Sequence, residues 1–281
     1  MENPRKFPFE FDGLCSTVCY SGENDKLTFS QALTGVQPAQ PILPVSHTTS
    51  LGTFKSIFAS GTILTNGFCP LNGTKGCKGY FFYGGPYYVL KNQNGTIQIE
   101  ETLSRPIGLI FRPEAFAGKE HDIYPFDTGA FLQNRYAPFS PPDVQVAQYH
   151  LPSQGLERAA ATVRLMFGDN KTYMAGNYKA HAGNHTDPYA AKLRDMYGKA
   201  VSSDHRRHRI EVLADYQVSI NDLLGVVVPD EYYTRECGSV LGSGLKFAVL
   251  KYVTMCDFDP DRDSAVMLAK ATEFLREQKY F

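Results

Sequence analysis

Four aromatic residues in a row, Tyr80 to Tyr83, are followed directly by Gly84, Gly85 and Pro86. Consecutive rings favour a strand covered by protein, because exposed rings would leave a large apolar area in water. Two glycines and a proline cannot continue such a strand, so the chain is predicted to turn at once. The segment is therefore either a core strand that ends in a tight turn or a platform of rings on which a flat ligand stacks.

Predicted strands and helices are mixed along the chain without a regular alternation. Short runs rich in branched residues predict strands at 44–49, 80–83, 105–113, 206–213, 223–229 and 245–253. Apolar residues at helical spacing predict helices at 50–61, 155–167, 187–200 and from 261 to the end. The first of these helices has Ser50 as a predicted N-cap and Gly61 as a predicted C-cap. Because strands and helices do not alternate, the sequence predicts an α+β fold and not a doubly wound parallel sheet.

The chain has 281 residues, which fits one large domain or two small ones. Residues 1–44 are irregular and proline-spaced, and they predict an arm or lid laid on a domain formed by residues 45–281. Within that domain, residues 116–152 are rich in proline and tyrosine and lack periodicity. A segment of that length predicts an insertion, and such insertions often carry function.

Composition excludes some classes of protein and leaves others open. The chain is 43% hydrophobic and 20% charged, and its formal charge of −1 gives no general attraction to nucleic acids or membranes. No apolar run approaches the ~20 residues of a membrane helix, so no membrane partner is expected. Six scattered cysteines in a chain of this size are expected to be reduced, which predicts a cytoplasmic protein. His181 and His185 are separated by glycine and asparagine, which argues against a helix, so no metal site is predicted.

Three chemically interesting residues lie on separate predicted strands in the order histidine, tyrosine, glutamate: His47, Tyr83 and Glu211. This order resembles the ADP-ribosyltransferase superfamily of the His-Tyr-Glu type. More closely, the segments VSHTTSLGTFKSIFASGTI, FFYGGPYY and RRHRIEVLADYQVSINDLLGVVVP are similar to segments of the DarT-type DNA ADP-ribosyltransferase toxins. The resemblance covers residues from about 45 to 230 in three patches. It departs at Tyr87 and Tyr88, where toxins of that type carry an arginine shortly after the aromatic segment.

The resemblance implies a central, split, antiparallel sheet flanked by helices, and NAD as the co-substrate. It implies transfer of ADP-ribose, a glycosyltransferase reaction that releases nicotinamide, with a toxin–antitoxin or anti-phage defence role and a nucleic-acid acceptor. An antitoxin or inhibitor protein is an implied partner. The catalytic residues implied are His47, Tyr83 and Glu211. The NAD-binding residues implied are His47, Thr48, Thr49, Tyr83, Gly84, Tyr87 and Arg209.

The chemistry of these residues suits such a site, and each has a structural alternative. A carboxylate such as Glu211 stabilises an oxocarbenium-like centre, and it can also orient or deprotonate the acceptor. Tyrosine faces attract the nicotinamide ring, and Gly84 lets the backbone approach a ligand. Alternatively, His47 is a core histidine, the aromatic row is a core strand, and Glu211 forms a buried salt bridge with Arg207 or Arg209.

The acceptor of the transferred group is the least constrained part of the hypothesis. Residues 116–152 hold several rings together with Arg135 and Tyr136, a mixture that suits stacking on the unpaired bases of single-stranded DNA or RNA. A plain structural loop is the alternative. A protein side chain, a small molecule or water fits the same donor site, so an NAD hydrolase is an alternative function. Another is a non-catalytic module that binds a nucleotide or a single strand and could lose Glu211 cheaply.

Overall fold

The computed structural model describes residues 28–87, 105–132, 136, 145–178, 187–198, 205–241, 246–254 and 260–281. The predictions made for residues 1–27, Tyr88, Arg135, His181 and His185 lie outside the described residues. Within the described part of the chain, no helix is long and apolar enough to cross a membrane.

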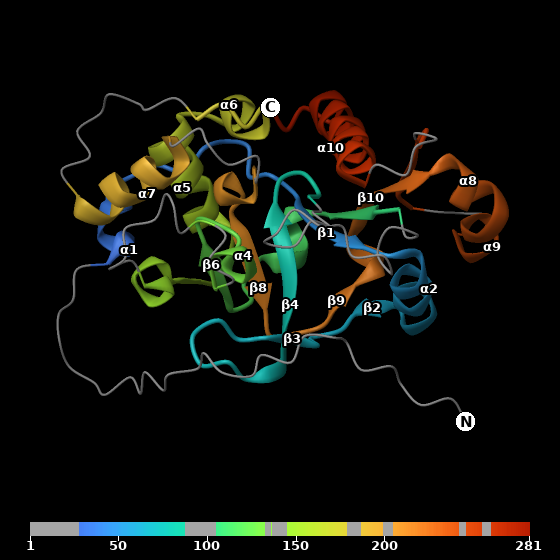
Figure 1. The fold of residues 1–281 in the computed structure, drawn as a ribbon, viewed down its shortest axis with the longest axis horizontal. Coiled ribbons are helices and arrows are strands. Elements are labelled where there is room, and N and C mark those ends of the chain that lie inside the picture. Colours follow the sequence, from blue (N-terminus) through green and yellow to red (C-terminus); the bar gives the residue numbers. More distant parts are fainter. Residues whose placement is uncertain are drawn as a thin grey trace.

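The described strands form one large sheet and one small one (Figure 1). The large sheet has nine strands in the order β11-β10-β5-β1-β4-β8-β6-β7, with β3 attached to β4. Its strands are β1 (Val45–Thr49), β3 (Gly67–Phe68), β4 (Lys75–Tyr83), β5 (Ile107–Phe111), β6 (His121–Tyr124), β7 (Leu151–Ser153), β8 (Glu211–Ala214), β10 (Leu223–Pro229) and β11 (Ala248–Tyr252). All neighbours are antiparallel except β10 and β11, which are parallel. The predicted α+β class is confirmed.

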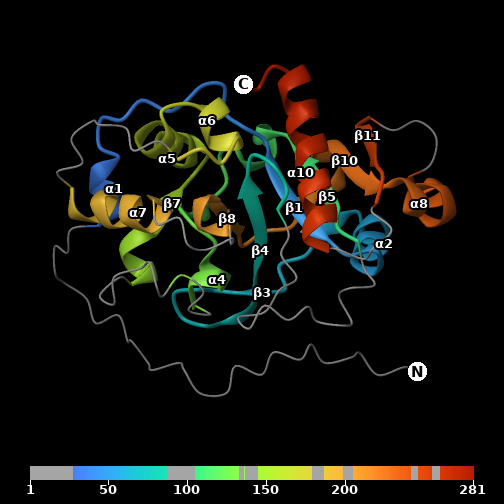
Figure 2. The same cartoon turned by 45° about the horizontal axis from the view of Figure 1, so that its top comes forward.

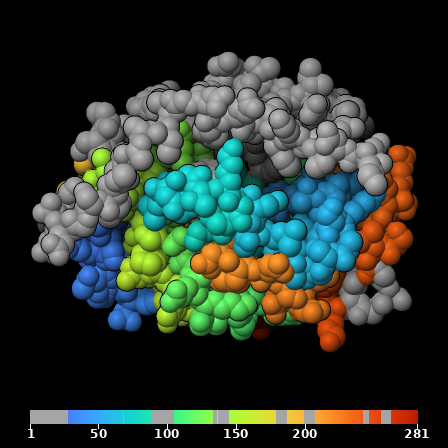
Figure 3. Space-filling view, turned by 90° about the horizontal axis from the view of Figure 1, so that it is seen from below, coloured from blue at the N-terminus to red at the C-terminus, as the bar shows by residue number. Residues whose placement is uncertain are grey.

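The small sheet joins β2 (Thr62–Ile63) to β9 (Val218–Ser219). Figure 3 shows the molecule from below, with the segment around β9 in orange beside the chain around β2 in blue to cyan. Two segments more than 150 residues apart in the sequence therefore meet below the large sheet.

Helices gather at both ends of the large sheet. Figure 2 shows α1, α5, α6 and α7 on the side of β7 and α2 and α8 on the side of β11, and Figure 1 shows α9 beside α8. Their bounds are α1 (Phe29–Ala32), α2 (Leu51–Ser60), α4 (Thr128–Leu132), α5 (Glu157–Phe167), α6 (Asn170–Met174), α7 (Pro188–Gly198), α8 (Asp230–Tyr232) and α9 (Gly238–Leu241). The longest helix, α10 (Pro260–Glu277), packs along β5, β10 and β11 (Figure 2). Short 3₁₀ turns occupy Pro113–Phe116, Val146–Tyr149, His205–His208 and Ile220–Asp222, and a π turn occupies Tyr233–Cys237.

The helix α2 is capped as the sequence predicts. Ser50 Oγ accepts a hydrogen bond from the Thr53 amide, which satisfies one of the first free N–H groups of the helix. Gly61 ends the helix with φ of +77°, a left-handed conformation that glycine adopts without steric cost. Phe54 and Ile57 bury the face that turns toward the sheet.

Two expectations about segments need correction. Residues 116–152 are not an irregular insertion where they are described, because they contain β6, α4 and β7. Strands of four and three residues are too short to display the period of two that identifies a strand. The strand expected from residue 206 begins only at Glu211, because His205–His208 form a 3₁₀ turn. The described part of the predicted arm packs into the core through Phe29, Ala39 and Leu43.

The large sheet opens between β1 and β4. These strands pair only where Val45 lies opposite Tyr83 and Ser46 opposite Phe82, whereas β1 pairs with β5 along its whole length. On the edge of β4 that faces away from β1, residues 79–82 pair with β8. The predicted split in the sheet is therefore present, and it lies beside His47.

Candidate active site

Two faces of the sheet must be distinguished before the site can be assembled. Directly opposite residues of an antiparallel pair point to the same face. Phe82 lies opposite Glu211 of β8 and opposite Ser46 of β1. These three side chains, together with Tyr80 and Thr48 two positions further along their strands, share one face, which we call the glutamate face.

The residues between them point to the opposite side, which we call the histidine face. It carries His47 and Phe81, whose ring centroids are 5.6 Å apart, and also Tyr83. The three residues predicted to be catalytic are therefore not brought together on one face. Glu211 lies on one side, and His47 and Tyr83 lie on the other.

Glu211 is 2% exposed and is held by the start of α4. Its Oε2 accepts hydrogen bonds from the backbone N of Thr128 at 3.0 Å and from the Thr128 Oγ1 at 2.5 Å. Two donors on one oxygen stabilise a negative charge, and they fix the position of the carboxylate. The arrangement supplies a rigid anion between β4 and β6.

His47 spans the split between β1 and β4. Its Nδ1 lies 2.8 Å from the carbonyl oxygen of Tyr80, and because a carbonyl only accepts, Nδ1 carries the proton. Burial lowers the pKa of His47, against the opposing effect of the hydrogen bond to Tyr80, so the ring is neutral at pH 7. In this tautomer Nε2 is an acceptor, available to a hydroxyl group of a ligand.

The aromatic row is divided by the alternation of the strand. Tyr83 is 0% exposed, its hydroxyl accepts from the Leu43 amide at 2.9 Å, and its carbonyl accepts from the Tyr173 hydroxyl at 2.8 Å. Burial also raises the pKa of Tyr83. The ring predicted to contact a ligand is therefore part of the core. Tyr80 and Phe82, which sequence analysis did not select, are the partly exposed rings, and they lie on the glutamate face.

The two glycines after β4 make room for protein side chains. A Cβ on Gly84 would lie 2.6 Å from Met174 Sδ, and one on Gly85 would lie 2.7 Å from Leu268 Cδ1. Gly84 also has φ of +86°, which favours glycine. On the side where a Cβ of Gly84 would lie, Met174 of α6 fills the space, so the absence of a side chain there serves packing.

Arg209 is 4% exposed, yet its charge is not neutralised by any described carboxylate. Its guanidinium carbon lies 5.4 Å from the ring centre of Tyr87 and 6.0 Å from that of Tyr173. Arg209 lowers the pKa of Tyr173, although burial has the larger effect and raises it to about 12. The Nε and Nη1 atoms of Arg209 are buried without a hydrogen-bond partner. The alternative of a salt bridge between Glu211 and Arg209 is therefore not what the described residues show.

Three predicted residues remain to be placed: Thr48, Thr49 and Tyr136. Thr48 lies on the glutamate face, and its Oγ1 is buried without a hydrogen-bond partner. Thr49 is 5% exposed and belongs to the histidine face. Tyr136 is 0% exposed and lies against Phe131, so this ring of the predicted acceptor pair is in the core.

Comparisons with known proteins give structural similarity alone. No family model matches the chain, and no curated protein matches it. The structure of Thermus sp. 2.9 DarT in complex with NAD+ is similar with a TM-score of 0.44 and 10% identity, over 76% of this chain and 97% of that one. The same DarT in complex with ADP-ribosylated ssDNA gives 0.44 and 11%, over 79% and 99%. These TM-scores are below 0.5, so a functional argument must rest on the residues of the site.

Proposed function

We propose that this chain is an NAD-dependent ADP-ribosyltransferase that releases nicotinamide and transfers ADP-ribose to an acceptor. The observation that carries the proposal is Arg209, a buried guanidinium with two N–H groups that lack acceptors. An unpaired buried charge costs several kcal/mol, on the order of the desolvation penalty that a partner would offset. A bound anion removes that cost, and the diphosphate of NAD is such an anion.

The surroundings of Arg209 suit a dinucleotide better than a simple anion. Tyr87 is partly exposed and lies within cation–π distance of the guanidinium, so its ring can also stack on a base. Glu211 is two residues further along the same segment, on the face that carries Tyr80 and Phe82. An anion site, rings and a fixed carboxylate together suit the binding and cleavage of a dinucleotide.

The proposed chemistry assigns one role to each side of the split sheet. When the bond to nicotinamide breaks, positive charge develops on the ribose, and the Glu211 carboxylate stabilises it. His47 accepts a hydrogen bond from a ribose hydroxyl through Nε2. Thr48 Oγ1, which has no described partner, donates to another polar atom of the donor.

The finer parts of the proposal rest on the sequence resemblance described above. We propose a nucleic acid as the acceptor, single-stranded because the formal charge of −1 predicts weak attraction to duplex phosphates. A role as a toxin or anti-phage effector, controlled by an antitoxin or inhibitor protein, belongs to the same part of the proposal. Two alternatives differ from the transferase in the fate of the ADP-ribose: an NAD hydrolase transfers it to water, and a binding module leaves NAD uncleaved.

The test is incubation of the purified protein with NAD labelled in its adenine, with single-stranded DNA, RNA or no acceptor. Free nicotinamide is measured by chromatography, and retained label is measured on protein, DNA and RNA. Glu211→Gln is expected to lower nicotinamide release by roughly 10²–10³-fold and to preserve NAD binding, because it removes charge and little volume. The matched control is Glu273→Gln, a fully exposed glutamate on α10.

The outcomes separate the alternatives. Nicotinamide release without retained label indicates a hydrolase, and label only on protein side chains rejects the nucleic-acid acceptor. NAD binding without release, unchanged in Glu211→Gln, indicates a binding module. Absence of both binding and release in the wild-type protein rejects the proposal as a whole.

A further inference from the structure

A second group of polar side chains lies on the glutamate face, one row away from Glu211. Tyr124 of β6 lies opposite Glu211. Asp122 lies opposite Leu213, the next residue of β8 on the same face. Lys78 of β4 shares this face, because it lies two residues before Tyr80, which lies opposite Leu213. His150, just before β7, stacks on Tyr124 with ring centroids 5.5 Å apart. The group therefore adjoins the proposed catalytic carboxylate through a single tyrosine.

Asp122 organises this group by using both of its oxygens. Oδ1 lies 2.6 Å from His150 Nε2, and Oδ2 lies 2.8 Å from Lys78 Nζ. Burial alone would raise the pKa of Asp122, but the hydrogen bonds and charges of His150 and Lys78 lower it to about 2. Asp122 is therefore ionised at neutral pH. A carboxylate only accepts hydrogen bonds, so His150 Nε2 carries a proton, and in the neutral ring Nδ1 is the basic atom.

Two further observations indicate that the group faces a ligand. Within the described residues, the His150 ring makes one hydrogen bond, through Nε2, and the side chain is 24% exposed. Tyr124 is 0% exposed, and its buried hydroxyl has no hydrogen-bond partner. Such a hydroxyl costs free energy until a polar atom of a ligand or a water satisfies it.

Glu211 is engaged by the start of α4 on one of its oxygens. Its Oε2 already accepts two hydrogen bonds from Thr128, so this oxygen is better suited to a fixed charge than to the uptake of a proton. We propose that His150, oriented by Asp122, is the base that takes the proton from the acceptor nucleophile. This inference rests on the proposed function and names the acceptor side of the same site. It restricts the acceptor to a group that carries a removable proton, such as a ring N–H, a hydroxyl or an amine.

The proposed step is balanced as follows. The bond between nicotinamide and the ribose C1′ breaks, and its electron pair leaves with nicotinamide, which becomes neutral. A lone pair of the acceptor forms the new bond to C1′, and the acceptor proton passes to His150 Nδ1. Asp122 stabilises the resulting imidazolium, as a carboxylate does in other histidine-based sites.

The groups that influence the titration of His150 are few among the described residues. Asp122 and Tyr124 of β6 face it directly. Lys78 acts through Asp122, and Asp215 lies 4.0 Å from Lys78. Cys69 interacts electrostatically with Tyr124 and Lys78.

The experiment compares His150→Ala and Asp122→Asn with the wild-type protein, using labelled NAD and a single-stranded DNA oligonucleotide that contains all four bases, or RNA. Transfer of label is expected to fall by roughly 10²-fold in His150→Ala, with an unchanged Kd for NAD. Added imidazole is expected to restore part of the lost rate, which a merely structural histidine would not allow. The acid limb of the wild-type pH–rate profile is expected to disappear in His150→Ala.

Asp215→Asn is the matched control, because it removes a carboxylate near the same lysine without touching His150. Its transfer rate is expected to stay within about twofold of the wild-type rate. Transfer in His150→Ala at the wild-type rate, or a loss that imidazole cannot restore, overturns the inference and leaves the proposed function in place. A wild-type protein that neither binds nor cleaves NAD rejects both together.

Discussion

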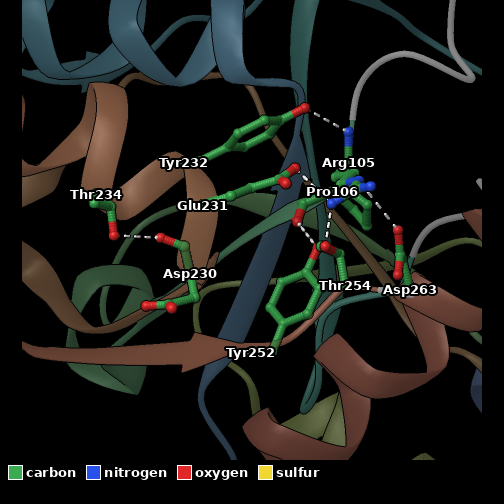
Figure 4. Close-up of polar contacts among 9 residues, drawn as sticks. All are labelled: Arg105, Pro106, Asp230, Glu231, Tyr232, Thr234, Tyr252, Thr254 and Asp263. Atoms are coloured by element: carbon green, nitrogen blue, oxygen red, sulfur yellow. Dashed lines mark hydrogen bonds and ion pairs between the residues drawn. The ribbon is translucent and has the colours of Figure 1, made fainter. Parts of the chain in front are cut away.

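Two arginines with little exposed surface, Arg105 and Arg209, differ in the contacts that their guanidinium groups make. Arg105, before β5, contacts Glu231 of α8, Thr254 after β11 and Asp263 of α10 through its guanidinium, and its amide donates to the Tyr232 hydroxyl (Figure 4). Arg209, before β8, has two rings beside it and no described carboxylate.

The difference separates a charge that belongs to the fold from a charge that serves a ligand. Arg105 contacts two carboxylates from elements that are far apart in the sequence, so its charge is compensated by groups of the fold itself. Arg209 contacts two rings, but no described carboxylate compensates its charge. An anion that binds the unpartnered Nε and Nη1 groups would therefore add to its stabilisation. The comparison predicts that the two arginines will respond oppositely to the same substitution.

The largest effect is expected from Arg105→Met. The substitution removes the partner that Glu231 and Asp263 share. Asp263 is 2% exposed, and loss of the partner of such a buried carboxylate costs about 3–5 kcal/mol, whereas Glu231 is partly exposed and adds little. The free energy of unfolding, measured with urea, checks this value. Arg276→Met on the exposed side of α10 is the control and is expected to stay within about 0.5 kcal/mol of the wild type. A loss below about 1 kcal/mol for Arg105→Met would remove the contrast.

The second prediction concerns the stability and the NAD affinity of a variant at Arg209. Arg209→Met is expected to keep or raise the free energy of unfolding, because it removes an unpaired buried charge and fills the same space. The same variant is expected to lose NAD affinity by roughly 10–100-fold, the value of one or two charged hydrogen bonds. Calorimetric titration and urea unfolding of one preparation measure both quantities. Arg194→Met, an exposed arginine on α7, serves as the control, and a destabilised Arg209→Met with normal NAD affinity contradicts the proposal.

Two tyrosines offer an uncharged version of the same comparison. Tyr83→Phe removes the acceptor of the buried Leu43 amide, and it is expected to cost about 1–2 kcal/mol of stability without changing NAD affinity. Tyr87→Leu is expected to leave stability unchanged and to weaken NAD binding about fivefold, because a ring contact is worth ~1 kcal/mol. The reverse pattern would assign Tyr83 to the ligand and Tyr87 to the core.

The elements that were predicted from sequence are those whose signals are local. Ser50 and Gly61 mark the ends of α2, and the long apolar runs of β5 and β10 identify strands without reference to the rest of the chain. The short strands β6 and β7 were missed, because pairing with β8 and with each other stabilises them and their own residues carry little strand signal.

The candidate site was predicted only in part, for a related reason. Glu211 and Arg209 could be selected because charges beside an apolar strand are visible in the sequence, and the structure places both in buried positions. Which ring of the aromatic row shares the glutamate face depends on the register between β4 and β8, which are about 130 residues apart in the chain. A shift of one residue changes the face. The sequence therefore favours Tyr83 as the ligand contact, whereas Tyr80 and Phe82 are the rings that share the face of Glu211. Only the pairing of Phe82 with Glu211 decides this.

The smallest predicted effect concerns Asp122, a partly buried carboxylate that contacts Lys78 and His150. The pKa of Asp122 is lowered from 3.8 to about 2: burial opposes this shift, and His150 and Lys78 produce it. Because the folded protein binds this proton more weakly than the unfolded chain, the stabilisation is complete above pH ~4 and is lost as the pH falls toward 2. Partial exposure screens the interaction, so about 1–2 kcal/mol is expected at pH 7. The difference in unfolding free energy between the wild type and Asp122→Asn should therefore shrink between pH 5 and pH 2, measured by urea unfolding at each pH. Asp215→Asn is expected to differ little from the wild type across this range, and an equal pH dependence in both variants would show that Asp122 is not specifically compensated.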